Sequence, residues 1–576
     1  MDEESVAVQE TIRQILSGMG IRKVISVDDF YTAADSHYED AVALFQTARS
    51  NREAEYSELI PRDILDAPEN IWTRRLQIFW LEATPDARLA ILSELAAKTG
   101  YENLPSDVRD LSLLKGLVPE DVFVAMGPDD WDRDREDILA KAQDNHGVLC
   151  LFDQDLRLAD RSESAGMTLL QQTLGMRGGN YVICGLLTQT LGKDEELLKA
   201  RKFAAKMGLS LDQFLPISKD RLRGDPMEFA DGLKMTVLNY ARERLSRQVT
   251  DVTKQASEKA QQHMNDIGVY DFEHIVIRSS EGEGVWEPDT LFRLFDLFRY
   301  NAFRAMVLDP ERRVSLYGDI ERMRAICDIK TSDWQPDCPS NQVHRIRHAE
   351  LFDAAKLLNP AHQPLDLGDI FEVGDGRYYI LLAQPCDLMI RSKPMGKRSI
   401  DTATLVRIQT YAKAKDHPGE VSSFRLSYFE DQPGREAFVK FRDSFQMSLN
   451  VLDLAVFNDD GQCRIPLSDA DANEFPTLHK PWRRRFEVLQ RYYQATHQKF
   501  QKIPYLRASN YQKRALKHLL LCSDKDIDLS YDANGSFEFG IRRVGRYRVP
   551  LSTQLLSAYF SFLSRNPQEH DFARRQ

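Results

Sequence analysis

Polar side chains stand at the ends of four apolar segments in the first 220 residues, and together they could bind and accept a phosphoryl group. Asp28 and Asp29 follow IRKVISV, Asp153 ends GVLCLFD, Thr188 ends YVICGLLT, and Lys219 follows FLPIS. Phosphorylating an aspartate requires carboxylates that hold Mg²⁺ and an acceptor carboxylate. It also requires a hydroxyl and an ammonium that bind the oxygens of the transferred group. The sequence contains all of these groups, in that order.

Such groups can act together only if a framework brings the ends of separate strands to one place. Five apolar segments alternate with segments of helical periodicity, which indicates a parallel sheet covered by helices on both faces. Ligands bind at the carboxyl ends of the strands in such sheets. We therefore predict an α/β, doubly wound, five-stranded domain over residues 1–224. Its strands are expected within residues 21–31, 121–128, 147–156, 181–190 and 214–222.

This arrangement resembles the receiver domain of two-component response regulators. The resemblance extends to DQDLRLADRSESAGMTLLQQ, where the acceptor acid is followed by a loop, a glycine and an apolar helix. It implies that Asp28, Asp29 and Asp153 bind Mg²⁺ and that Asp153 is the phosphoacceptor. It further implies that Thr188 and Lys219 contact the phosphoryl group, and that a histidine-kinase-type protein is the partner.

The sequence departs from the receiver pattern in three places. Residues 32–118 separate the acid pair from the second strand, where one helix would suffice, and we predict a helical insertion there. Lys219 is followed by Asp220 instead of the usual proline. Pro216 stands where the fifth strand usually has an aromatic residue, and Phe214 could substitute for it.

A second family shares part of this pattern. Asp153-Gln154-Asp155 after an apolar strand also resembles the DxD motif of haloacid-dehalogenase-like phosphatases. In that family the motif normally follows the first strand, whereas here an acid pair precedes the acceptor. Leu156 also follows Asp155 in place of a Gly-Thr-like turn. We therefore favour the receiver.

The remaining chain predicts a multi-domain protein. A long helix and helical connector are expected over 225–335, since Asp225 and Pro226 are typical of a helix start. Its partial apolar stripe suits a packed helix and leaves a homodimer through residues 225–265 open. We predict an α+β C-terminal domain: a β-rich part over 343–468, shaped as a small β-barrel or sandwich, then a helical region with a terminal β-hairpin over 469–576.

Two features of the C-terminal half could bind or react. Cys386, followed by Asp387, could be a nucleophile or a buried thiol beside a turn. Basic residues with interleaved aromatics suit nucleic acid, an acidic partner, or salt bridges within the domain. These residues are Lys480, Arg483, Arg484, Arg485, Arg542, Arg543, Arg546 and Arg548.

Composition narrows the class of protein. The chain has 576 residues and a net charge of −12, which argues against a general nucleic-acid binder. Its seven cysteines form no CxxC pair, so neither structural zinc nor a disulfide framework is expected. With no apolar run of membrane-spanning length and an acidic start, we expect a cytoplasmic protein.

Three functions fit these observations. The favoured one is a signalling protein in which phosphorylation of Asp153 controls a C-terminal output region, as in bacterial stress or defence systems. The second is a pseudo-receiver scaffold that binds partner proteins without phosphorylation. The third is an enzyme whose active site lies near Cys386.

Overall fold

The computed structural model divides the chain into two compact units. The first comprises residues 1–258 and 300–335, and the second comprises residues 259–299 and 336–576. The described residues are 3–32, 37–51, 60–101, 103–159, 161–162, 164–209, 213–283, 285–331, 341–374, 376–388, 390, 398, 400–411, 422–430, 434–467, 480–502, 529–532 and 536–564.

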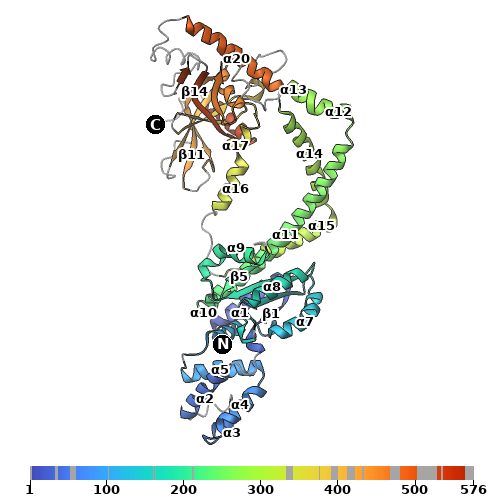
Figure 1. Ribbon diagram of the computed structural model, residues 1–576, viewed down its shortest axis with the longest axis vertical. Helices are drawn as coiled ribbons and strands as arrows, with labels where there is room; N and C mark the ends of the chain where they lie inside the picture. Colours follow the sequence, from blue (N-terminus) through green and yellow to red (C-terminus); the bar gives the residue numbers. More distant parts are fainter. Residues whose placement is uncertain are drawn as a thin grey trace, which may run out of the picture. The chain divides into compact units, whose positions relative to one another are not determined.

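The first unit contains a five-stranded sheet in which all strands are parallel (Figure 1). Its order is β2-β1-β3-β4-β5, so the winding direction reverses between β1 and β3. Every residue of β3 and β4 is buried, as expected for strands covered on both faces. The five predicted strands are all present: β1 (Ile21–Val27), β2 (Phe123–Met126), β3 (Gly147–Asp153), β4 (Val182–Thr188) and β5 (Leu215–Ser218).

Helices cover both faces of this sheet. Leu149 and Leu151 of β3 pack in one apolar cluster with α1 and α11, whereas Cys150 and Phe152 pack in another with α7, α8 and α9. Successive side chains of a strand point to opposite faces, which explains the alternation. These helices are α1 (Glu3–Gly18), α7 (Pro128–Lys141), α8 (Ala165–Met176), α9 (Glu196–Met207) and α11 (Pro226–Asn265).

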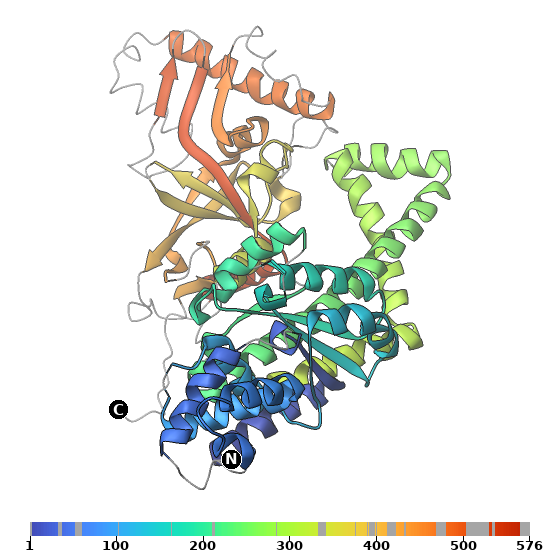
Figure 2. The ribbon, with the colours of Figure 1, turned by 60° about the horizontal axis from the view of Figure 1, so that its bottom comes forward.

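The predicted insertion between β1 and β2 is helical. Its helices α2 to α6 pack against one another (Figures 1 and 2), and their apolar sides join the cluster of α1 and α11. Thr84 caps α5 by accepting a hydrogen bond from Ala87 N at 3.2 Å. The helices are α2 (Tyr38–Asn51), α3 (Arg62–Leu65), α4 (Trp72–Glu82), α5 (Pro85–Thr99) and α6 (Ser106–Leu117).

Helix α11 begins where the sequence predicted. The carboxylate of Asp225 accepts a hydrogen bond from Met227 N at 2.9 Å. The first part of α11 packs on the sheet through Phe229, Leu233 and Val237. The predicted helical connector is formed by α12 (Val269–Glu273), a π-helix (His274–Ser279), α13 (Ser280–Glu283), α14 (Glu287–Val307) and α15 (Pro310–Cys327).

The second unit contains a curled antiparallel sheet, which agrees with the predicted barrel or sandwich at this coarser level. The strands follow the order β10-β11-β9-β8-β7-β14-β12, and β6 and β13 also pair with β14. They are β6 (Phe352–Ala354), β7 (Asp369–Val373), β8 (Arg377–Leu382), β9 (Thr402–Tyr411), β10 (Ser423–Leu426), β11 (Glu436–Ser448), β12 (Gln462–Pro466), β13 (Leu529–Asp532) and β14 (Ser536–Tyr547).

The terminal β-hairpin predicted within residues 469–576 is present, because the consecutive strands β13 and β14 pair antiparallel. Residues 536–547 form one long strand, β14, which bends along its length (red in Figure 2) and pairs with β7 and β12. Gly545 lies at an irregularity in the pairing of β14 with β7. The C-terminal strand therefore lies inside the sheet of the β-rich region.

Helices cover this second sheet as well. Helix α20 contributes to one apolar cluster, and α22 contributes to another. The helices are α16 (Asn341–Leu351), α17 (Ala355–Leu358), α18 (Pro385–Leu388), α19 (Leu449–Leu452), α20 (Lys480–Gln501) and α22 (Leu551–Leu563). Among all described helices, none is both long and apolar enough to cross a membrane.

Candidate functional site

The structure places the polar residues predicted from the sequence at the carboxyl ends of strands of the parallel sheet. Asp28 and Asp29 follow β1, Asp153 and Thr188 end β3 and β4, and Lys219 follows β5. None of the five is more than 7% exposed. The carboxyl ends of β1 and β3, which carry Asp28 and Asp153, flank the point where the strand order reverses. Open α/β sheets bind ligands at such a point. Their positions at the strand ends are confirmed, while their roles stay a prediction.

Asp153 and Lys219 form a buried ion pair. Lys219 Nζ lies 2.6 Å from Asp153 Oδ2, and each side chain is 6% exposed. Burial raises the pKa of Asp153, and the charge of Lys219 partly opposes this rise. Burial alone would lower the pKa of Lys219, but Asp153 and Asp28 outweigh it and raise this pKa. Lys219 therefore favours the charged form of the acceptor carboxylate, although burial keeps the pKa of Asp153 above its ordinary value.

Asp28 is buried close to the negative charge of Asp153. Burial, followed by the negative charge of Asp153, raises its pKa well above the ordinary value, although Lys219 acts in the opposite direction. Its side chain accepts a hydrogen bond from Phe30 N at 3.0 Å. Because Lys219 pairs with Asp153 and Asp153 still raises the pKa of Asp28, a cation would relieve the repulsion between these two carboxylates.

These carboxylates fit Mg²⁺ by their donor chemistry. Within the described ranges, no group of three or more His, Cys, Asp or Glu side chains forms a complete metal cage. Mg²⁺ commonly uses only one or two carboxylates, together with waters and phosphate oxygens. The mutual repulsion of Asp28 and Asp153 is what such an ion would neutralise.

We expect Asp28→Asn to stabilise the first unit at neutral pH by more than about 1 kcal/mol. The asparagine keeps an acceptor for Phe30 N but carries no charge to bury. Because the pKa of Asp28 is higher in the folded than in the unfolded chain, folding takes up a proton, and the free energy of unfolding falls as pH rises through the folded-state pKa.

That pH dependence should be weaker in Asp28→Asn. Hydrogen exchange of the β1 and β3 amides in the full-length chain, corrected for intrinsic rates, measures it. An identical pH dependence in both proteins would contradict the expectation.

The hydroxyl of Thr188 is already engaged. It donates a hydrogen bond to Gln154 Oε1 at 2.5 Å and accepts one from Thr190 N at 3.1 Å. The Oγ1 atoms of Thr188 and Thr190 lie 2.8 Å apart. Gln154 was not among the predicted site residues, because its contact with Thr188 joins residues that are 34 apart in the sequence.

Gly166 allows α8 to approach the acceptor strand closely. A Cβ atom at this position would lie 1.7 Å from the carbonyl oxygen of Asp153, so no larger residue fits without a shift. Gly166 N donates to Gln154 O at 3.3 Å. The close approach of α8 to the acceptor strand therefore explains why this position requires a glycine.

Charged residues join the site to the neighbouring helices. Arg223 of α10 (Asp220–Arg223) makes two hydrogen bonds of 2.7 Å to Asp110 of the insertion helix α6. Arg221 binds Glu196 of α9 at 2.8 Å and lies 3.4 Å from Asp231 of α11. The segment that begins with Lys219 is thus held by both the insertion and α11.

Phe214 is 1% exposed and packs in the apolar cluster of α7, α8 and α9. Pro216, which replaces the usual aromatic, is also buried in β5. Whether Phe214 takes the place of that aromatic stays a prediction.

Cys386 is exposed at α18, and its Sγ lies 3.8 Å from Gln384 Oε1. A carboxamide is not a base that could activate a thiol. The Nδ1 atoms of His348 and His362 donate hydrogen bonds to the backbone carbonyls of Tyr428 and Val456 instead. These contacts do not support a nucleophilic role for Cys386.

The arginines of β14 form ion pairs within the second unit. Arg543 and Arg546 both lie against Asp369, with Arg546 Nε 2.6 Å from Asp369 Oδ1. Arg543 is fully buried, and burial lowers its pKa to about 10. Arg542 and Arg548 pair with Glu372 and Asp353. This matches the intramolecular alternative that the sequence left open.

The basic residues of α20 differ in their burial and in their contacts. Arg485 is buried and stacks over Trp482, with 4.0 Å between the guanidinium carbon and the ring centroid. Arg484 lies 3.4 Å from Glu281, and Arg483 is exposed. Lys480 begins the helix, but its side chain lies outside the described residues. Nucleic-acid binding by this cluster stays a prediction.

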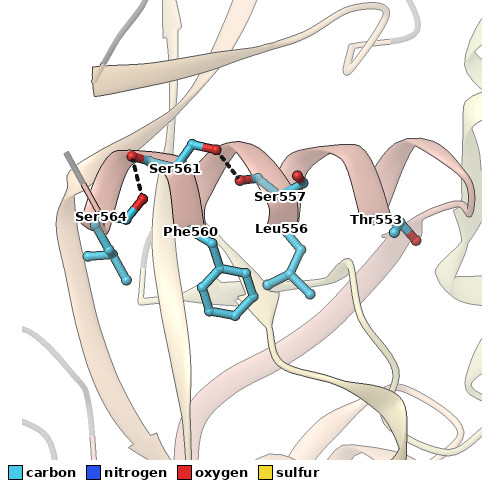
Figure 3. A pocket seen from close by; sticks show the side chains of 7 residues that line it. Thr553, Leu556, Ser557, Phe560, Ser561 and Ser564 are labelled. Atoms are coloured by element: carbon cyan, nitrogen blue, oxygen red, sulfur yellow. Dashed lines mark hydrogen bonds between the residues drawn. The ribbon is translucent and has the colours of Figure 1, made fainter.

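A further open hollow of about 640 Å³ lies along α22 (Figure 3). Its lining residues are Thr553, Leu556, Ser557, Phe560, Ser561, Leu563 and Ser564. The hydroxyls of Ser561 and Ser564 bind carbonyls of their own helix. None of these residues is titratable, so the hollow offers no acid, base or metal ligand.

Comparison with known proteins identifies no relative. No family model, no curated protein and no solved structure matches this chain.

Proposed function

We propose that residues 1–224 form a receiver-like phosphoacceptor domain in which Asp153 accepts a phosphoryl group and controls an output region in the C-terminal half. The observation that carries this proposal is the buried pair of Asp153 and Lys219 beside Asp28, at the edge where the strand order reverses. This combination places an acceptor carboxylate, a lysine ammonium and a second buried carboxylate at one point.

In the proposed reaction, a carboxylate oxygen of Asp153 attacks phosphorus, and the bond from phosphorus to the donor's leaving group breaks. Lys219 keeps the acceptor charged and neutralises charge on the transferred group. Thr188 offers a hydroxyl to a phosphoryl oxygen. Two of the carboxylates of Asp28, Asp29 and Asp153 would hold Mg²⁺ together with waters and phosphoryl oxygens, and the ion would supply further charge neutralisation. The donor would be a histidine-kinase-type protein in the cytoplasm, within a bacterial stress or defence system.

Helix α11 is the proposed route to the output region. It begins seven residues after Lys219, and Arg221 connects α9 to α11 through Glu196 and Asp231. Thr331 adds a hydrogen bond of 2.6 Å to Asp231. A change at Lys219 would therefore act directly on the start of α11.

The test is phosphorylation of the full-length chain by a small acyl phosphate in the presence of Mg²⁺. We expect the intact mass to rise by one phosphoryl group, and the modification to disappear in Asp153→Asn and on chelation of Mg²⁺. Asp129→Asn, which removes an exposed carboxylate paired with Arg161, is the matched control and should be modified like the wild type. An unmodified wild-type chain that also fails to bind beryllium fluoride would rule out the proposal.

The burial of the site favours a second candidate, a pseudo-receiver scaffold that binds partner proteins without phosphorylation. Asp153 is 5% exposed, and the Thr188 hydroxyl is already bound to Gln154. The same experiment separates the two candidates, because a scaffold of this kind would gain no phosphoryl group even as the wild type.

A further inference from the structure

Gln154 connects the ends of two strands through its side chain. Its Oε1 accepts hydrogen bonds from Thr188 Oγ1 at 2.5 Å and from Thr190 Oγ1 at 3.3 Å. The backbone of Gln154 is held separately: its N–H donates to Leu187 O at 2.9 Å, and its carbonyl accepts from Gly166 N at 3.3 Å. The carboxamide can therefore turn away while the main chain stays in place.

This contact competes with the proposed chemistry. A threonine hydroxyl has one proton to donate, and in this structure Thr188 donates it to Gln154. The oxygens of a phosphoryl group are acceptors and need donors. Thr188 is fully buried, and its oxygen also accepts a hydrogen bond from Thr190 N. To donate to a phosphoryl oxygen, the hydroxyl must therefore turn its proton away from Gln154 while the end of the strand stays in place.

We propose that Gln154 is a positioning residue that holds the Thr188 hydroxyl in the unphosphorylated state and lowers the affinity of the site for a phosphoryl group. The inference rests on the proposed function of Asp153 and specifies how that site is regulated. Phosphorylation then requires Gln154 to release Thr188, and loss of the phosphoryl group allows the hydrogen bond to form again.

The experiment measures binding of beryllium fluoride with Mg²⁺ to the full-length chain by titration calorimetry. Removing the competing acceptor in Gln154→Ala should tighten binding roughly fivefold, the effect of one hydrogen bond of about 1 kcal/mol. Gln154→Met keeps the length of the side chain but lacks the acceptor oxygen, and should show the same gain. Gln172→Ala, which removes a carboxamide bound to Arg135 on the surface of the same unit, should bind like the wild type.

A double-mutant cycle shows whether the effect acts through Thr188. Thr188→Val should weaken binding by removing the donor, and Gln154→Ala should give no gain in the Thr188→Val background. A gain in Gln154→Ala that persists without the hydroxyl, or that is absent in Gln154→Met, would overturn the role of this hydrogen bond.

The two proposals fail in different ways. If the wild type binds beryllium fluoride and Gln154→Ala binds equally or more weakly, the role of Gln154 is wrong and the function of Asp153 stands. If neither protein binds and no acyl phosphate forms, both proposals fall. As a second readout, the acyl phosphate should persist roughly fivefold longer in Gln154→Ala than in the wild type, because the competing acceptor is gone.

Discussion

Replacing Lys219 with methionine is expected to lower the free energy of unfolding of the first unit by about 3 to 5 kcal/mol. The substitution leaves the carboxylate of Asp153 buried without its ammonium partner, in a site where Asp28 is also buried. An unpaired buried charge costs far more than a lost surface ion pair. Hydrogen exchange of the β3 and β4 amides in the full-length chain measures the loss.

A second substitution separates the charge effect from packing. Asp153→Asn in the Lys219→Met background should recover most of the lost stability, because the unpaired charge is then gone. Lys193→Met is the matched control: Lys193 is an exposed lysine of the same unit that pairs with Glu228, and its replacement should cause no measurable change. A small effect of Lys219→Met, similar to that of the control, would show that the ion pair is unimportant for the fold.

Replacing Arg543 with methionine is expected to destabilise the second unit by about 3 kcal/mol. The Arg543 guanidinium is fully buried and donates to Asn359 Oδ1 and to Gln363 O, both at 2.8 Å, beside Asp369. Methionine fills a similar volume, but the carbonyl and carboxamide acceptors lose their donor. Hydrogen exchange of the β7 and β14 amides measures the effect.

The neighbouring Arg542 provides the matched control for the replacement of Arg543. It is half exposed and pairs with Glu372 at the surface, so Arg542→Met should leave the exchange of these amides nearly unchanged. If Arg543 served a ligand instead of the fold, its replacement would also leave the exchange unchanged. That outcome would contradict the structural role we assign to it.

The sequence by itself determined the parallel sheet and the residues at its carboxyl edge. Strands such as GVLCLFD are apolar throughout and end in a polar residue, and this local pattern identifies both the strand and its functional end. The wide spacing after Asp29 likewise predicted a helical insertion. These features depend on short stretches of sequence, where periodicity and the type of the final residue suffice.

Only the tertiary structure decided which side chains meet across these elements. The bond between Thr188 and Gln154 joins residues 34 apart, and no local pattern indicates it. The same holds for Arg543, which shares the inward face of β14 with Phe539 and Ile541. The sequence left open whether its partner is nucleic acid, another protein or a residue of the same domain, and the structure shows Asp369 of β7 beside it. Local periodicity shows which face a residue takes, but the pairing of distant strands decides what that face meets.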